Sequence, residues 1–274
     1  MRKLALSMLF LAALPLAAQL KTPRPSPKAS VMQTIGLTDV TIVYSRPSVK
    51  GRTIWGDLVP YDKVWRTGAN EATTFTVSDD VTVNGQALAK GTYSLHTIPG
   101  KESWTVVFNK DAGQWGSFAY DQAKDALRVT AKPEKADFRE FLTFDFPQVS
   151  ADEATVAIRW ENLAVPFTVN AGTTKKVVAA ARDAVAGAKA DDWQTPLSAA
   201  TFAFNSNMKD EASQWLDKSI AVKETTRNLW LKARTQLAAG NKAEAAKTAT
   251  KAISLAAPGD KDLVTEIERQ MKGW

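Results

Sequence analysis

The chain contains no cysteine and only one histidine, and these two features exclude several classes of site. Without cysteine there is no disulfide and no thiolate ligand, so a packed core must supply the stability. One histidine cannot form the usual zinc sets. The acidic residues Asp79, Asp80, Asp121 and Asp125 lack the spacing of a calcium loop, and neither a glycine-rich phosphate loop nor a Gly-x-Ser-x-Gly motif occurs. We therefore expect no metal and no cofactor.

Runs of one charge are missing as well. The 35 Lys and Arg residues are dispersed among 29 Asp and Glu residues, which leaves a formal charge of only +6. A nucleic-acid-binding protein would show a basic patch or stripe, so no nucleic-acid partner is expected. Beyond the N-terminus, no stretch approaches the roughly 20 apolar residues that a membrane helix needs.

The N-terminus predicts export. Residues 1–18 have the pattern of a secretory signal peptide, with Arg2 and Lys3 before an apolar segment at 4–14. A single uncleaved N-terminal anchor is the alternative. Residues 19–28 contain three prolines and predict an extended tether. We therefore expect a periplasmic or extracellular protein with no membrane span after removal of the signal.

Residues 29–171 have the pattern of short β-strands. Apolar and polar residues alternate in many short segments that are separated by turn residues. Asn84-Gly85 is the strongest of these turn signals, because a type I′ hairpin needs positive φ at both central positions. Trp104 and Trp160 lie in alternating segments and are expected in the core. The pattern predicts an antiparallel β-sandwich or jelly roll.

Residues 172–274 change to an alanine-rich pattern that favours helices. Thr195 followed by Pro196 predicts the capped start of one helix. Segments 209–220 and 242–253 resemble each other at an offset of 33 residues. That period is typical of tetratricopeptide-like (TPR-like) helical hairpins, and a plain helical bundle is the alternative. The fold class expected for the whole chain is therefore α+β.

The segment 44–72 has neither a helical nor a strand period, and it is too long for an ordinary connection. Its aromatic residues argue against disorder, so we expect an ordered loop laid on a sheet and able to form a site. The candidate ligand-binding residues are Arg46, Arg52, Trp55, Tyr61, Trp65, Arg66, Asn70 and Glu71, together with Trp115 from a second loop that could close over the same pocket. For Trp115 itself, a place in the core is slightly favoured.

A structural interpretation of the same loop is equally open. Arg66 would pair with Glu71, Gly68 would take a positive φ, and Asn70 would bind backbone. The sequence does not choose between this corner and a ligand pocket.

His96 and Glu71 are the two candidate catalytic residues. His96 alternates with Tyr93, Leu95 and Thr97, so it is expected to point away from the core, towards the loop. There it could act as a general base beside Glu71 or a serine. The alternative is an ordinary packing or surface histidine without a role in any reaction.

Several motifs of the β region resemble a bacterial secreted family catalogued as domain of unknown function 2911. They are Ser26-Pro27-Lys28-Ala29-Ser30, Tyr44-Ser45-Arg46-Pro47, Lys50-Gly51-Arg52, Trp55-Gly56, Val59-Pro60-Tyr61, Val64-Trp65-Arg66-Thr67-Gly68-Ala69-Asn70-Glu71-Ala72, Gly91-Thr92-Tyr93-Ser94-Leu95, Ile98-Pro99, Trp104 and Gln114-Trp115-Gly116. The resemblance covers roughly residues 26–170. It implies export and a β-rich domain, and it brings no activity, cofactor or catalytic residue.

These observations leave two main functional hypotheses. The first is a non-catalytic binding or adaptor module of the cell envelope, with a small polar or glycan ligand at 44–72 and a protein partner on the helical tail. The second is an envelope hydrolase or lyase that uses Glu71 with Arg66 and His96. A third, purely structural interpretation leaves the helices as the only interaction surface.

Overall fold

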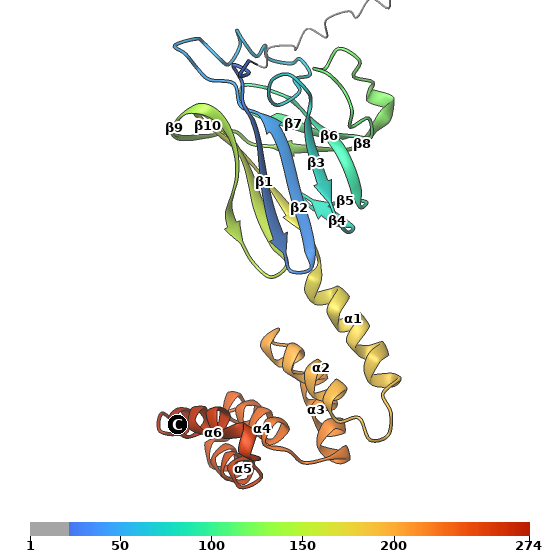
Figure 1. Cartoon of the computed structure of the whole chain (residues 1–274), viewed down its shortest axis with the longest axis vertical. Coiled ribbons are helices and arrows are strands. Elements are labelled where there is room, and N and C mark those ends of the chain that lie inside the picture. Colours follow the sequence, from blue (N-terminus) through green and yellow to red (C-terminus); the bar gives the residue numbers. More distant parts are fainter. Residues whose placement is uncertain (1–21) are drawn as a thin grey trace, which may run out of the picture.

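A computed structural model describes residues 22–274, so the predicted signal peptide and the start of the tether lie outside the described residues. The β region begins with β1 (Lys28–Ile35), β2 (Thr38–Ser45), β3 (Thr73–Val77), β4 (Val81–Val83) and β5 (Gln86–Leu88). It continues with β6 (Gly91–Ile98), β7 (Trp104–Asn109), β8 (Asp125–Ala131), β9 (Glu134–Val149) and β10 (Glu153–Asn170). The order of these elements is shown in Figure 1.

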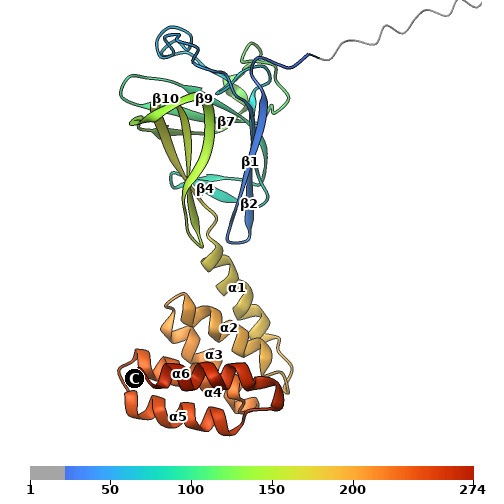
Figure 2. The same ribbon diagram turned by 60° about the vertical axis from the view of Figure 1, so that its left-hand side comes forward.

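The strands form two antiparallel sheets. The larger sheet has the order β1-β2-β3-β6-β7-β8, and the smaller has the order β5-β4-β10-β9. β4 and β5 form a hairpin in the smaller sheet, and Asn84 and Gly85 at its turn both adopt positive φ, which confirms the predicted turn. In Figure 2 the β9–β10 layer and the β1–β2 layer lie face to face.

Alternation along the strands builds the core between the two sheets. Phe75 of β3 and Phe108 of β7 meet Phe167 of β10, with ring centroids 5.0–6.2 Å apart. Trp104 and Trp160 are each 1 % exposed, as predicted. Both sheets therefore direct one face inward, and the predicted sandwich is confirmed.

The helices follow directly and lie at one end of the sandwich, opposite the 46–72 loop and the described N-terminus (Figures 1 and 2). They are α1 (Thr173–Ala186), α2 (Gln194–Asn205), α3 (Lys209–Val222), α4 (Thr226–Ala238), α5 (Lys242–Ser254) and α6 (Lys261–Met271). The chain is thus of the α+β class. None of the described helices is long and apolar enough to span a bilayer.

The 33-residue repeat corresponds to α3 and α5, the second helices of two hairpins, α2–α3 and α4–α5. Equivalent positions are buried in both copies: Ala212 with Ala245, Leu216 with Ala249, and Ser219 with Ala252. The repeat therefore preserves the packed face of each hairpin, as a TPR-like array requires.

The cap of α2 is not the one predicted from the sequence, which was Thr195. α2 begins at Gln194, one residue before Thr195, and the cap comes from Asp192. Its Oδ1 accepts the backbone N–H groups of Gln194 and Thr195, each at 3.0 Å. A carboxylate there also suits the positive end of the helix dipole, and the hydrogen bonds lower the pKa of Asp192.

Candidate functional site

The 44–72 loop is fixed to the sandwich by aromatic packing. Trp55 and Trp65 meet Trp104 and Trp160, and we call these four residues the tryptophan cluster. The ring centroids of Trp55 and Trp104 lie 5.0 Å apart, and Trp65 stacks on Trp160 at 5.9 Å. The backbone of Trp65 also exchanges two 2.8 Å hydrogen bonds with Thr97 of β6. The loop is therefore held by buried aromatic area and by sheet-like hydrogen bonds.

Two of the predicted ligand-binding arginines bind the protein itself. Arg46 donates to the Leu142 carbonyl and to Thr143 Oγ1, both at 2.9 Å, which ties the loop to β9. Arg52 donates to the carbonyls of Ser48 and Val49 and so closes a turn within the loop. Tyr61 is half-buried and packs on Gly56, where a Cβ would come within 2.8 Å of its ring.

The predicted pair of Arg66 with Glu71 is wrong. Glu71 instead accepts from Nη1 of Arg24 at 2.7 and 2.9 Å, and this contact lowers the pKa of the Glu71 carboxyl. The positive φ expected at Gly68 is wrong too, because Thr67 and Asn70 take that conformation instead.

Gly68 is nevertheless constrained by space, because a Cβ there would lie 3.1 Å from both the Ser45 carbonyl and Thr73 Oγ1. Asn70 does bind backbone, as the structural interpretation expected, through a 3.3 Å hydrogen bond to the Ser26 carbonyl. The loop is thus a tightly packed corner whose long-range polar contacts reach the tether as well as β6 and β9.

Because the Arg24–Glu71 pair is exposed, we expect it to contribute little. The two side chains are 51 % and 42 % exposed, so water and salt screen their attraction. Glu71→Gln should change the free energy of unfolding by less than about 0.5 kcal/mol. Urea titration at pH 7 measures this. Exposed ion pairs contribute at most about 1 kcal/mol to the free energy of unfolding. A loss well above that value would show that the pair holds the tether in place.

A small cavity, which we call the loop cavity, lies beside Trp65. It has a volume of about 210 Å³ and includes the side chains of Arg52, Arg66 and Trp160 in its lining. Within the described part of the chain, this lining contains two arginines and no carboxylate. Arg66 Nε is buried without a hydrogen-bond partner among the described residues, and burial lowers the pKa of Arg66. The lining of the cavity is therefore positively charged, and one of its residues, Arg66, has an unsatisfied donor.

Glu71 lines a different depression, which we call the Glu71 cleft. Its volume is about 340 Å³, and Lys28 and Gln114 also border it. Gln114 is 6 % exposed, and its Oε1 has no hydrogen-bond partner within residues 22–274. Of the nine predicted ligand-binding residues, Arg52, Trp65 and Arg66 line the loop cavity and Glu71 lines the Glu71 cleft, whereas the other five line neither.

His96 points away from the core as predicted, but not towards the 44–72 loop. It lies beneath the 110–124 segment, and its side chain is fully buried. Nε2 lies 3.1 Å from Ser94 Oγ and Nδ1 lies 3.1 Å from Ser117 Oγ. Burial lowers the pKa of His96 to about 4. The imidazole is therefore neutral at pH 7 and contacts neither Glu71 nor Arg66.

Trp115 contradicts the preference for a core position, because it is 60 % exposed. Its backbone pairs with Glu71. Its side chain is exposed to solvent, as is the side chain of Phe118 in the same loop. Trp115 lines neither of the two cavities described above. Apolar character alone could not reveal this, since the loop carries both buried and exposed aromatic residues.

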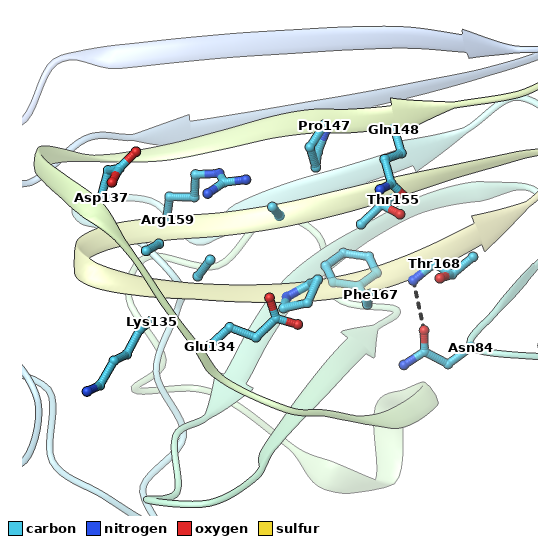
Figure 3. A pocket seen from close by; sticks show the side chains of 14 residues that line it. Asn84, Glu134, Lys135, Asp137, Pro147, Gln148, Thr155, Arg159, Phe167 and Thr168 are labelled. Carbon is cyan, nitrogen blue, oxygen red and sulfur yellow. Dashed lines mark hydrogen bonds between the residues drawn. The ribbon is translucent and has the colours of Figure 1, made fainter.

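One further cavity was not predicted at all. We call it the outer-face cleft; it lies on the side of the β9–β10 sheet that faces away from the core, with a volume of about 860 Å³ (Figure 3). Glu134, Asp137, Thr155 and Arg159 are among its lining side chains. The alternation at 154–160 could have signalled it, because every outward position there is small or polar. Among residues 22–274, no three histidine or acidic side chains are grouped closely enough to hold a metal ion.

Comparisons with known proteins identify the β region only. A search of curated proteins found no match, and a search of solved structures found no match either. A family model matches residues 26–169, which is more than half of the chain and nearly all of the sandwich. The chain therefore belongs to the family described as protein of unknown function, DUF2911.

Proposed function

We propose that this protein is an exported, non-catalytic binding module that holds a small anionic ligand in the loop cavity. The observation that carries the proposal is Arg66, which lines a cavity without carboxylates and whose buried Nε has no hydrogen-bond partner, as far as residues 22–274 are concerned. An unsatisfied buried donor is costly to a folded protein, and the cost is removed when an acceptor arrives. A carboxylate or phosphate supplies that acceptor together with the opposite charge.

The size and walls of the loop cavity narrow the class of ligand. Drug-sized ligands occupy sites of roughly 300–1,000 Å³. At about 210 Å³, the loop cavity suits something smaller, such as an acidic monosaccharide or a small organic acid. Trp65, which is half-buried, adds apolar surface against which a sugar ring or carbon chain can pack.

The alternative of hydrolase or lyase chemistry finds less support. That mechanism would need Glu71, Arg66 and His96 at one reacting centre. Glu71 and Arg66 line different cavities, and the imidazole of His96 is sealed beneath the 110–124 segment. Binding requires no such convergence. We retain the proposal of a protein partner on the helical hairpins, which lie at the end of the sandwich remote from the loop cavity (Figure 1).

Substitution of Arg66 by methionine tests this function, because methionine replaces the unbranched stem of the side chain and removes the guanidinium with all of its donors. We expect glucuronate, galacturonate, citrate or inorganic phosphate to bind the wild-type protein in isothermal titration calorimetry. Arg66→Met should weaken that binding at least about tenfold, as expected for a lost charge-assisted hydrogen bond. The free energy of unfolding should not fall, because the substitution also removes a buried, unpaired donor.

Arg139→Ala is the matched control, because Arg139 is an exposed arginine of β9 outside the loop cavity. It should leave binding unchanged. Two results would contradict the proposal. One is that none of the four anions binds. The other is that Arg66→Met binds as tightly as the wild type while losing stability, which would make Arg66 a structural residue.

A further inference from the structure

The outer-face cleft owes its shape to irregularities in β10. Pairing between β9 and β10 is interrupted at three places, between Thr155 and Ala157, between Arg159 and Glu161, and between Glu161 and Leu163. Glu161 takes a positive φ of 56°. Bulges of this kind bend a strand and increase its twist. Together they make β9 and β10 curve sharply, as the ribbon in Figure 3 shows.

The same irregularities determine which side chains face the cleft. Before the bend, Thr155, Ala157 and Arg159 face outward, and after it, Ala164, Pro166 and Thr168 do so. The change from odd to even positions follows from the extra residues at the bulges. Ala157 and Ala164 are only 1 % and 5 % exposed. These two small side chains form the bottom of the outer-face cleft, and their small size leaves space for a ligand above them.

Charges of both signs are balanced in the cleft. Glu134 and Asp137 are opposed by Lys135 and Arg159. In Figure 3 the carboxylate of Glu134 extends towards Phe167 within the cleft, whereas Lys135 points away from it. Arg159 contacts Asp145 through Nε at 2.9 Å, so its two Nη nitrogens remain available as donors. The cleft therefore presents both donors and acceptors without a strong field of either sign.

We propose that the outer-face cleft binds a neutral oligosaccharide. Sugar hydroxyls both donate and accept, so they match a lining that mixes carboxylate, guanidinium, amide and hydroxyl groups. The volume of about 860 Å³ lies within the range of ligand sites and exceeds what a single sugar would fill. Asn84 is already satisfied there, because its Oδ1 accepts the Thr168 N–H at 2.8 Å. Thr155, Gln148 and Glu134 are the side chains expected to contact hydroxyl groups.

An extended peptide is the less favoured occupant. Peptides that add to a sheet do so through main-chain hydrogen bonds along a free edge. The outer-face cleft is lined instead by side chains that stand on the face of the sheet. A face of this kind favours a ligand that is recognised through many separate hydroxyl contacts.

Calorimetric titration of the full mature chain with the soluble tetrasaccharides of chitin, cellulose, xylan and starch tests the proposal. We expect at least one of the four to bind. Glu134→Gln should weaken binding at least about fivefold, because an uncharged amide is a poorer acceptor. Thr155→Trp should abolish binding by filling the cleft, and the β-preference of tryptophan keeps the strand intact.

Arg139→Gln is the matched control, because Arg139 is an exposed residue of the same strand and does not line the outer-face cleft. It should bind the sugar as the wild type does. Circular dichroism confirms that each variant is folded. The proposal fails if no tetrasaccharide binds, if Glu134→Gln and Thr155→Trp both bind as tightly as the wild type, or if a short extended peptide binds in place of the sugars. Arg66→Met should leave sugar binding unchanged. Failure of the proposal for the outer-face cleft can therefore be distinguished from failure of the proposal for the loop cavity.

Discussion

Replacing Trp65 by alanine is expected to lower the free energy of unfolding by about 3 kcal/mol, the lower end of the cost of removing a large aromatic side chain. Trp65 is half-buried, stacks on Trp160 and approaches Trp55 at 6.0 Å. Its Nε1 also donates to the Gly68 carbonyl at 3.1 Å. The substitution removes all of these contacts and opens a hole beneath the loop.

The loop itself should become sensitive to proteases. In the wild type, segment 46–72 is held by the tryptophan cluster and by the backbone hydrogen bonds of Trp65. Without the indole, local opening of the segment should need less free energy than global unfolding. Limited proteolysis, with mass spectrometry to locate the cuts, should therefore find new cleavage within 46–72.

Trp115→Ala is the matched control, because it removes the same side chain from an exposed position in the neighbouring loop. It should change the free energy of unfolding by no more than about 0.5 kcal/mol. If the two alanine variants proved equally stable, the tryptophan cluster would not hold the loop. The loop cavity would then lack the rigid wall that the proposed ligand needs.

Local signals in the sequence determined much of this fold. Asn84 and Gly85 predicted a hairpin because few other pairs tolerate two consecutive positive φ values. The helices after Gly172 followed from alanine content and from breaks at Gly240 and Pro258. Such rules involve a few adjacent residues, so a single sequence is enough to apply them.

Contacts between distant residues could not be predicted in this way. The partner of Glu71 is Arg24, 47 residues earlier, and not Arg66 nearby. Charge complementarity allows many pairings, and only the path of the tether selects one of them. The same applies to Trp115, since nothing local distinguishes an exposed indole from the buried indole of Trp65.

The candidate sites were even harder to predict from the sequence than these individual contacts. The alternation of apolar and polar residues at 154–160 and at 165–169 is typical of two separate strands, whereas β10 continues through both with a bend at Glu161. A bulge depends on one residue that fails to pair, and this leaves no periodic signal. The outer-face cleft is a consequence of that bend, so predicting the strands was not sufficient to predict the cleft.

The stability of the protein should fall as the pH drops from about 6.5 to about 4, because of His96. Burial holds the pKa of this imidazole at about 4, against an ordinary value of 6.5. Within this interval the unfolded chain binds a proton that the folded chain does not. The free energy of unfolding therefore decreases on acidification, by about 1.4 kcal/mol per pH unit and about 3 kcal/mol in total.

The surroundings of His96 explain why its neutral form is retained. Ser94 and Ser117 offer hydroxyl groups to the two ring nitrogens, and hydroxyls satisfy a neutral imidazole without adding charge. Tyr120 packs against the imidazole at 5.2 Å between ring centroids. Asp125 raises the pKa of His96 more than Asp111 does, but it is engaged by Tyr120 and Arg128 at 2.7 Å each. Its attraction for a protonated His96 is too weak to offset the loss of water.

Urea titrations of the wild type and of His96→Asn at pH 7, 6, 5 and 4 isolate this contribution. Asparagine still hydrogen-bonds to the serines but has no proton to gain, so its stability should depend less on pH. The variant should be less stable at pH 7, where it lacks the packing of the imidazole, and the difference should shrink by about 3 kcal/mol towards pH 4. Carboxyls with lowered pKa values, such as Glu71, affect both proteins alike and cancel in the difference. If the two curves stayed parallel, His96 would have a similar pKa in the folded and unfolded chains, and the 110–124 segment would not seal it from water.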